Sequence, residues 1–67
     1  MKTLTVITTT YNRGYCLHQL YNSLLAQNSR DFIWLIVDDG STDNTHDVVE
    51  KFIAESDFEI RYVYQQN

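Results

Sequence analysis

The sequence contains little cysteine, little glycine and little positive charge. Its 67 residues include one cysteine, two glycines, and five Lys or Arg against nine Asp or Glu. A single cysteine excludes a disulfide framework and a paired-cysteine zinc site, so we expect Cys16 to be a small buried or half-buried helix residue. Neither the P-loop motif nor the glycine motif of classical NAD-binding proteins is present, which excludes both classes.

The charge pattern and the apolar runs exclude further classes. The net charge is −4 and the basic residues are scattered, so no basic stripe is available to bind a nucleic-acid backbone. The apolar run at 32–37 is too short to span a membrane, and the first residues lack the apolar region of a signal peptide. We therefore expect a cytoplasmic protein with no membrane segment in this chain. A content of 43% apolar residues predicts one small globular domain over residues 1–67.

Hydrophobic periodicity predicts three strands that alternate with two helices. Residues 4–9, 32–37 and 60–64 are short runs typical of strands, and the first two carry apolar or β-branched residues suited to burial on both faces. Residues 15–27 and the segment around 48–53 carry apolar side chains at helical spacing. The order βαβαβ predicts an α/β fold with three parallel strands and two crossover helices, half of a doubly wound, Rossmann-like sheet.

Polar clusters follow the predicted strands at their carboxyl ends, where such sheets bind ligands. They are Thr9-Thr10-Tyr11-Asn12, Asp38-Asp39-Gly40 and Gln65-Gln66-Asn67. Neighbouring strand residues point to opposite faces, so one aspartate of the pair can face the site while the other anchors the loop to backbone N–H groups. A carboxylate accepts the N3–H of uracil but meets only a lone pair on cytosine, so it can select the base. Tyr11 can stack on that base, and a threonine hydroxyl can bind its carbonyl groups.

Each of these features also has a purely structural interpretation. The aspartate pair and the polar residues up to position 45 can form a turn and cap the next helix by accepting its first N–H groups. Tyr11 can be a packed loop aromatic. His18 and His46 lie on different predicted helices, where solvated or capping roles are expected, and no metal ligands are assigned. The residues taken singly leave both interpretations open.

Four pieces of the sequence occur together in one order and spacing. They are Thr5–Arg13, the helix with Leu17, Leu20, Ser23, Leu24 and Gln27, the stretch Val37–Thr45, and the ending Tyr64–Asn67. In this combination the whole chain resembles the beginning of the family 2 glycosyltransferases, which are inverting enzymes with the GT-A fold. The resemblance favours the functional interpretation of the aspartate pair.

The resemblance implies a sugar-nucleotide donor, usually a UDP-sugar, bound together with Mn²⁺ or Mg²⁺, and transfer of the sugar to a glycan or lipid-linked acceptor. Thr9, Tyr11 and Asp39 match the family positions that hold the nucleoside, with Asp39 on the base. Asp38 is the adjacent candidate for nucleotide binding, and Arg13 is a candidate for contact with the phosphates. Many members carry proline at the position of Thr9, and threonine occurs within the family's range.

The resemblance also implies that the catalytic residues lie elsewhere. The family's metal-binding Asp-x-Asp follows a fourth strand and its general base lies further on, and neither can be placed in this sequence. We therefore expect the N-terminal nucleotide-binding part of a glycosyltransferase domain, which holds no metal by itself and is inactive alone. The full-length enzyme is expected in the cytoplasm or at the inner face of the membrane. The family's first strand is central, so an uncovered edge at Leu4–Thr9 predicts self-association.

Two other functions fit parts of the pattern. A non-catalytic nucleotide-binding or interaction module would use the same half-fold, and it would differ from a glycosyltransferase in showing no turnover of any sugar nucleotide at full length. A phospho-acceptor receiver domain also places acidic residues at strand ends, but its acidic pair follows the first strand, which here ends in threonines.

Overall fold

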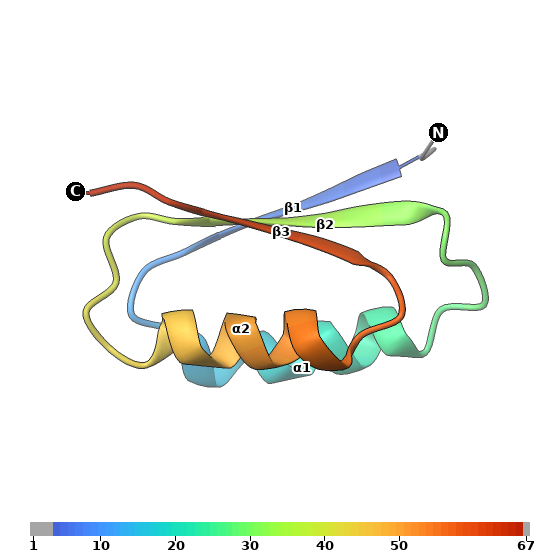
Figure 1. Cartoon of the computed structure of the whole chain (residues 1–67), viewed down its shortest axis with the longest axis horizontal. Coiled ribbons are helices and arrows are strands. Elements are labelled where there is room, and N and C mark those ends of the chain that lie inside the picture. The colour runs from blue at the N-terminus through green and yellow to red at the C-terminus, as the bar shows by residue number, and fades with distance from the viewer. Residues whose placement is uncertain (1–3, 67) are drawn as a thin grey trace.

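The structure alternates strands and helices in the predicted order (Figure 1). The computed structural model describes residues 4–66, so the predicted turn at Asn67 lies outside the described residues. The elements are β1 (Leu4–Thr10), α1 (Gly14–Leu25), β2 (Phe32–Asp38), α2 (Thr45–Glu55) and β3 (Glu59–Tyr64). Cys16 is a half-buried residue of α1, as predicted.

The three strands form one parallel sheet in the order β1-β2-β3. At the carboxyl end of the sheet Thr10 of β1 pairs with Asp38 of β2, which in turn pairs with Tyr64 of β3. The loops that follow β1 and β2 therefore leave the sheet at the same edge, on the side where the C-terminus lies in Figure 1. This arrangement confirms the predicted βαβαβ half of a Rossmann-like sheet.

The hydrophobic core fills the space between the sheet and the two helices. Its buried side chains are Leu17, Tyr21, Phe32, Trp34, Ile36, Val49, Phe52 and Phe58. The rings of Tyr21 and Phe52, from α1 and α2, stack with their centroids 4.1 Å apart. Trp34 is fully buried, and its Nε1–H donates to the Thr8 hydroxyl at 2.9 Å, so the largest core side chain keeps its polar atom paired.

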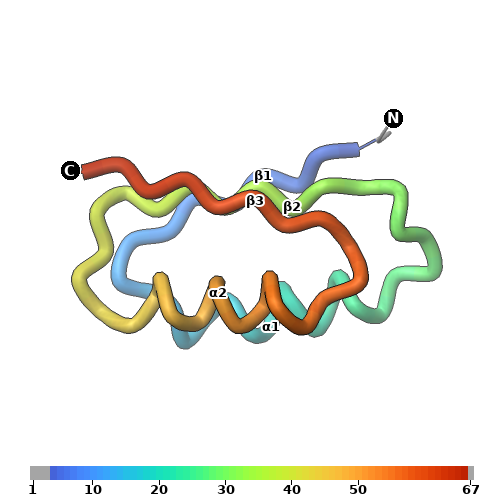
Figure 2. The backbone as a smooth tube through the Cα atoms, in the orientation of Figure 1, coloured from blue at the N-terminus to red at the C-terminus, as the bar shows by residue number. Residues whose placement is uncertain are grey.

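Both helices cover the same face of the sheet (Figures 1 and 2). Two successive right-handed crossovers that run in one direction across a sheet place their helices on one side of it. On β2 the residues facing the helices are buried, whereas the alternating Ile33, Leu35 and Val37 are half-buried. On β1 the side chain of Ile7 is 64% exposed. The prediction that the first two strands are buried on both faces was therefore wrong for the described residues, since only one face is covered.

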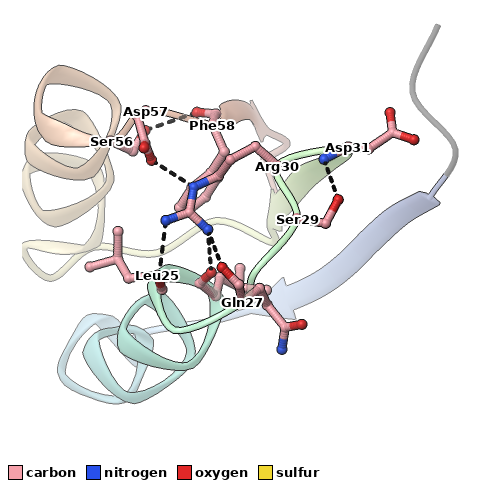
Figure 3. Close-up of polar contacts among 9 residues, drawn as sticks. Leu25, Gln27, Ser29, Arg30, Asp31, Ser56, Asp57 and Phe58 are labelled. Carbon is pink, nitrogen blue, oxygen red and sulfur yellow. Dashed lines mark hydrogen bonds and ion pairs between the residues drawn. The ribbon is translucent and has the colours of Figure 1, made fainter.

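Arg30 joins the end of α1 to the turn before β3 (Figure 3). Its guanidinium donates to the backbone carbonyls of Gln27 and Leu25 at 2.7 and 3.1 Å, and its Nε donates to Asp57 Oδ1 at 3.0 Å. The same group lies over the ring of Phe58, 5.8 Å from its centroid. Arg30 thus satisfies carbonyls that the last turn of a helix leaves unpaired, at the end of α1 remote from the loops after β1 and β2.

Candidate nucleotide-binding site

An open pocket of about 300 Å³ lies at the carboxyl edge of the sheet. Thr9, Thr10, Tyr11 and Arg13 line it from the end of β1 and the segment that follows, and Asp39 lines it from the segment after β2. The volume is at the lower end of the range for small-molecule sites. We call residues 11–13 the first loop and residues 39–44 the second loop.

Hydrogen bonds hold the two loops together. The backbone N–H of Asp39 donates to the carbonyl of Thr10 at 2.9 Å, which extends the β1–β2 pairing by one step. The backbone N–H of Asn12 donates to the Ser41 hydroxyl at 2.7 Å. In the opposite direction, the N–H of Thr42 donates to Asn12 Oδ1 at 2.7 Å. The walls of the pocket are therefore fixed relative to each other by contacts between residues about 30 positions apart.

Asp43 joins the beginnings of the two helices. It accepts the N–H of Thr45 at 3.0 Å and that of Gly14 at 3.4 Å, and the Thr45 hydroxyl also donates to it. These hydrogen bonds, with that from the Thr45 side chain the largest, lower the pKa of Asp43. A Cβ at Gly14 would lie only 3.1 Å from the Thr45 Cα, so the close approach of the helices favours glycine there. The prediction that this polar segment accepts the first N–H groups of the second helix is thus confirmed for Asp43, whereas the N-cap residue Asn44 makes no side-chain capping hydrogen bond.

The two adjacent aspartates occupy different environments. Asp39 is exposed and lines the pocket, where its carboxylate is accessible to a ligand. Asp38 is 1% exposed and lies on the helix-covered face of β2. It accepts the N–H of Ser41 at 2.9 Å and the hydroxyl proton of Tyr62 on β3. One aspartate therefore faces the pocket while the other anchors the second loop, the division that strand alternation predicts.

The hydrogen bonds of Asp38 decide its ionisation. Burial alone would raise the pKa of this carboxyl group, but the hydrogen bonds from Ser41 and Tyr62 outweigh it, so the pKa of Asp38 lies below its ordinary value. The pKa of Tyr62 is raised, first because its hydroxyl is buried and then because that hydroxyl donates to Asp38. At neutral pH the pair therefore consists of a carboxylate and a protonated phenol.

The structure brings four of the five predicted site residues to one pocket. Thr9, Tyr11, Arg13 and Asp39 line it together, whereas Asp38 does not. Nucleotide contact by Asp38 stays a prediction, because the contacts of its carboxylate are with the protein.

Sequence reasoning assigned no individual role to three residues at the site, although Thr10 and Asn12 belong to the polar cluster predicted after the first strand. Thr10 lines the pocket, and its Oγ1 is buried without a hydrogen bond to any described residue. Asn12 and Tyr62 support the pocket from behind through the loop contacts and the Asp38 hydrogen bond. Thr10 and Asn12 were marked by their place in that cluster, and asparagine is also one of the few residues that tolerate a left-handed turn conformation, whereas Tyr62 gave no local signal.

Residues 4–66 offer neither a cluster of metal ligands nor a membrane-spanning helix. Within that range no three His, Cys, Asp or Glu side chains gather in a way that would hold a metal ion. Neither α1 nor α2 is long and apolar enough to cross a membrane.

Comparison with known proteins decides the family. The Glycosyl transferase family 2 model matches residues 5–67, which includes both loops and all five predicted site residues. The chain belongs to this glycosyltransferase family. The predicted resemblance is thereby confirmed. No solved structure gives a significant match.

Of three curated relatives of this family 2 chain, two carry glycosyltransferase names and the third is named as a polymerase. An uncharacterized glycosyltransferase of Nostoc sp. is 39% identical over 64 residues, covering 96% of this chain and 20% of its own length. Validoxylamine A glucosyltransferase of Streptomyces hygroscopicus subsp. jinggangensis is 39% identical over 66 residues, covering 96% of this chain and 15% of its own. Teichoic acid poly(glycerol phosphate) polymerase of Staphylococcus epidermidis is 35% identical, covering 94% and 9% respectively. The chain thus spans a fifth or less of the length of these three relatives.

Proposed function

We propose that residues 1–67 are the donor-nucleotide-binding part of a longer family 2 glycosyltransferase, and that the donor is a UDP-sugar. The observation that carries this proposal is the grouping of Thr9, Tyr11, Arg13 and Asp39 around one pocket at the carboxyl edge of a parallel sheet. Family membership supports sugar transfer, and the longer relatives support a longer protein.

Each pocket residue has a proposed role. Asp39 accepts the N3–H of uracil, and Tyr11, which is 50% exposed beside it, stacks on the base. The Thr9 hydroxyl binds a base carbonyl or the ribose, and the Arg13 guanidinium contacts the diphosphate. Cytosine presents a lone pair to Asp39, so a carboxylate in this place disfavours a CDP-sugar.

The chemical step is proposed for the full-length protein and not for this chain alone. A Mg²⁺ or Mn²⁺ ion bound by residues outside the chain would neutralise the diphosphate leaving group, and we assign no part of that site to residues 4–66. We propose inverting transfer to a glycan or lipid-linked acceptor, in the cytoplasm or at the inner face of the membrane. The 67 residues alone would then bind nucleotide without turnover.

The proposal is tested by calorimetric titration of the full-length protein with UDP, CDP and GDP. We expect UDP to bind in preference to the other two, and Asp39→Ala to remove that preference. Asp47→Ala is the matched control, because Asp47 is an exposed aspartate in the first turn of α2 and does not line the pocket. Equal binding of all three nucleotides, or an unchanged preference in Asp39→Ala, would contradict the proposed base site.

A further inference from the structure

We infer that Asn12 is a positioning residue, which holds the first loop against the second and thereby sets the base preference of the pocket. The inference rests on the proposed function, because it concerns how the same pocket discriminates between nucleotides. Neither the pattern of polar residues at the strand ends nor the family match assigns a role to Asn12.

The backbone of Asn12 has an unusual conformation. Its φ angle is 51°, and it is the one residue other than glycine with positive φ among the described residues. Most side chains are strained in this left-handed region, whereas asparagine tolerates it. Asn12 lies between Tyr11 and Arg13, two exposed residues that line the pocket.

Asn12 makes three hydrogen bonds, and all of them cross to the second loop. Its N–H donates to Ser41 Oγ at 2.7 Å. Its side-chain Oδ1 accepts from the N–H of Thr42 at 2.7 Å and from the N–H of Asp43 at 3.2 Å. One side chain therefore pairs two backbone donors of the second loop, which follow Asp39 within four positions.

These contacts determine where the Tyr11 ring, which is proposed to stack on the base, lies relative to the Asp39 carboxylate, which is proposed to select it. Asp39 is fixed at the base of the second loop by its N–H bond to the Thr10 carbonyl. Tyr11 lies on the first loop, and the position of that loop depends on Asn12. A base stacked on Tyr11 meets the Asp39 carboxylate only when the two loops keep their spacing. Loss of the Asn12 side chain should therefore weaken discrimination between bases and not only overall binding.

The test replaces Asn12 by glycine, since glycine keeps the positive φ and the backbone N–H while removing the amide. We expect UDP binding to the full-length protein to weaken about tenfold, as for the loss of two hydrogen bonds of ordinary strength. We also expect the ratio of UDP to CDP affinity to fall several-fold. Asn28→Gly is the matched control, because Asn28 is an exposed asparagine in the turn at the opposite end of α1.

The affinity ratio separates positioning from a merely structural role. If Asn12→Gly only lowered the folded fraction, the apparent affinities for UDP and CDP would fall equally, and the inference would be overturned. If Asn12→Gly does not fold, Ser41→Ala removes the partner of the Asn12 N–H from the other loop and should lower the same ratio. An unchanged ratio in Ser41→Ala would overturn the inference in that case. A wild-type protein without UDP preference would instead refute the proposed function, and this inference with it.

Discussion

The hydroxyl group of Tyr62 on β3 donates a hydrogen bond to the buried carboxylate of Asp38 at the end of β2. The same carboxylate accepts the N–H of Ser41 in the second loop. A single buried anion therefore connects a strand remote from the pocket to the loop that carries Asp39. This connection explains why an aspartate that does not line the pocket is adjacent to one that does.

Removing the Tyr62 hydroxyl should destabilise the protein in a pH-dependent way. In Tyr62→Phe we expect the free energy of unfolding at pH 7 to fall by about 1–3 kcal/mol, as for a hydrogen bond to a charged group. The folded-state pKa of Asp38 is lowered. The contribution of the ionised Asp38 carboxylate to the free energy of unfolding is therefore present above the unfolded pKa of about 4, and it is lost as the pH falls through the folded pKa.

The difference in the free energy of unfolding between the wild type and Tyr62→Phe should accordingly decrease in acid. Urea denaturation of both proteins at pH 7 and at pH 3 measures it. Tyr15→Phe is the control, because the Tyr15 side chain on α1 is 71% exposed and its loss of a hydroxyl should change little. A difference that stayed constant between the two pH values would contradict the ionised hydrogen-bonded pair.

Substitution of the two aspartates by asparagine should separate their roles. An amide at position 39 can turn its NH₂ group toward N3 of cytosine. Asp39→Asn should therefore lower the ratio of UDP to CDP affinity about tenfold, with little change in the free energy of unfolding. Asp38→Asn should leave the ratio of UDP to CDP affinity unchanged and lower the free energy of unfolding by about 1–3 kcal/mol. The reason is that the Ser41 N–H and the Tyr62 hydroxyl both donate to Asp38, so the NH₂ group of the asparagine would face a donor and not an acceptor. Nucleotide titration and thermal unfolding of both variants give the comparison. A changed ratio in Asp38→Asn would contradict this separation of roles.

The Arg30 network should contribute to stability without affecting the pocket. Arg30→Ala leaves the carbonyls at the end of α1 without their side-chain donor, and we expect a loss of about 1–2 kcal/mol with unchanged UDP affinity. Most of this loss should come from the carbonyl contacts, since the ion pair with Asp57 is largely solvated. Arg61→Ala is the control, because Arg61 is exposed and pairs with Glu59 on its own strand. Equal losses in the two variants would show that the carbonyl contacts add nothing.

The edge of β1 should promote association of the 67-residue chain. Among residues 4–66, β1 pairs only with β2, so the backbone of Leu4–Thr9 has an edge that faces no other described strand. We expect sedimentation of the isolated chain to show concentration-dependent dimers or larger species, and Ile7→Lys to shift the distribution toward monomer. Ile53→Lys, which adds the same charge on α2, should not do so. A wild-type chain that stays monomeric at high concentration would contradict this use of the edge.

Much of the fold could be predicted because its signals are local. The helical spacing of Leu17, Tyr21 and Leu24 and the apolar run of β2 depend on neighbours within a few positions. The turn residues after β1 and β2 marked the edge of the sheet with the pocket in the same way. The burial of individual side chains was less predictable, because the exposure of Ile33 and Leu35 depends on which face of the sheet the helices cover.

The sequence by itself determined the order of the elements, the edge of the sheet where the pocket lies and the residue types gathered there. Periodicity, turn residues and strand alternation are properties of short segments, so they can be taken from a single chain without coordinates. Only the tertiary structure decided that Asp39 faces the pocket while Asp38 binds Tyr62, and that Asn12 joins the two loops. Those contacts join residues 24 to 31 positions apart, and their existence depends on the strand register and helix placement that form when the whole chain packs.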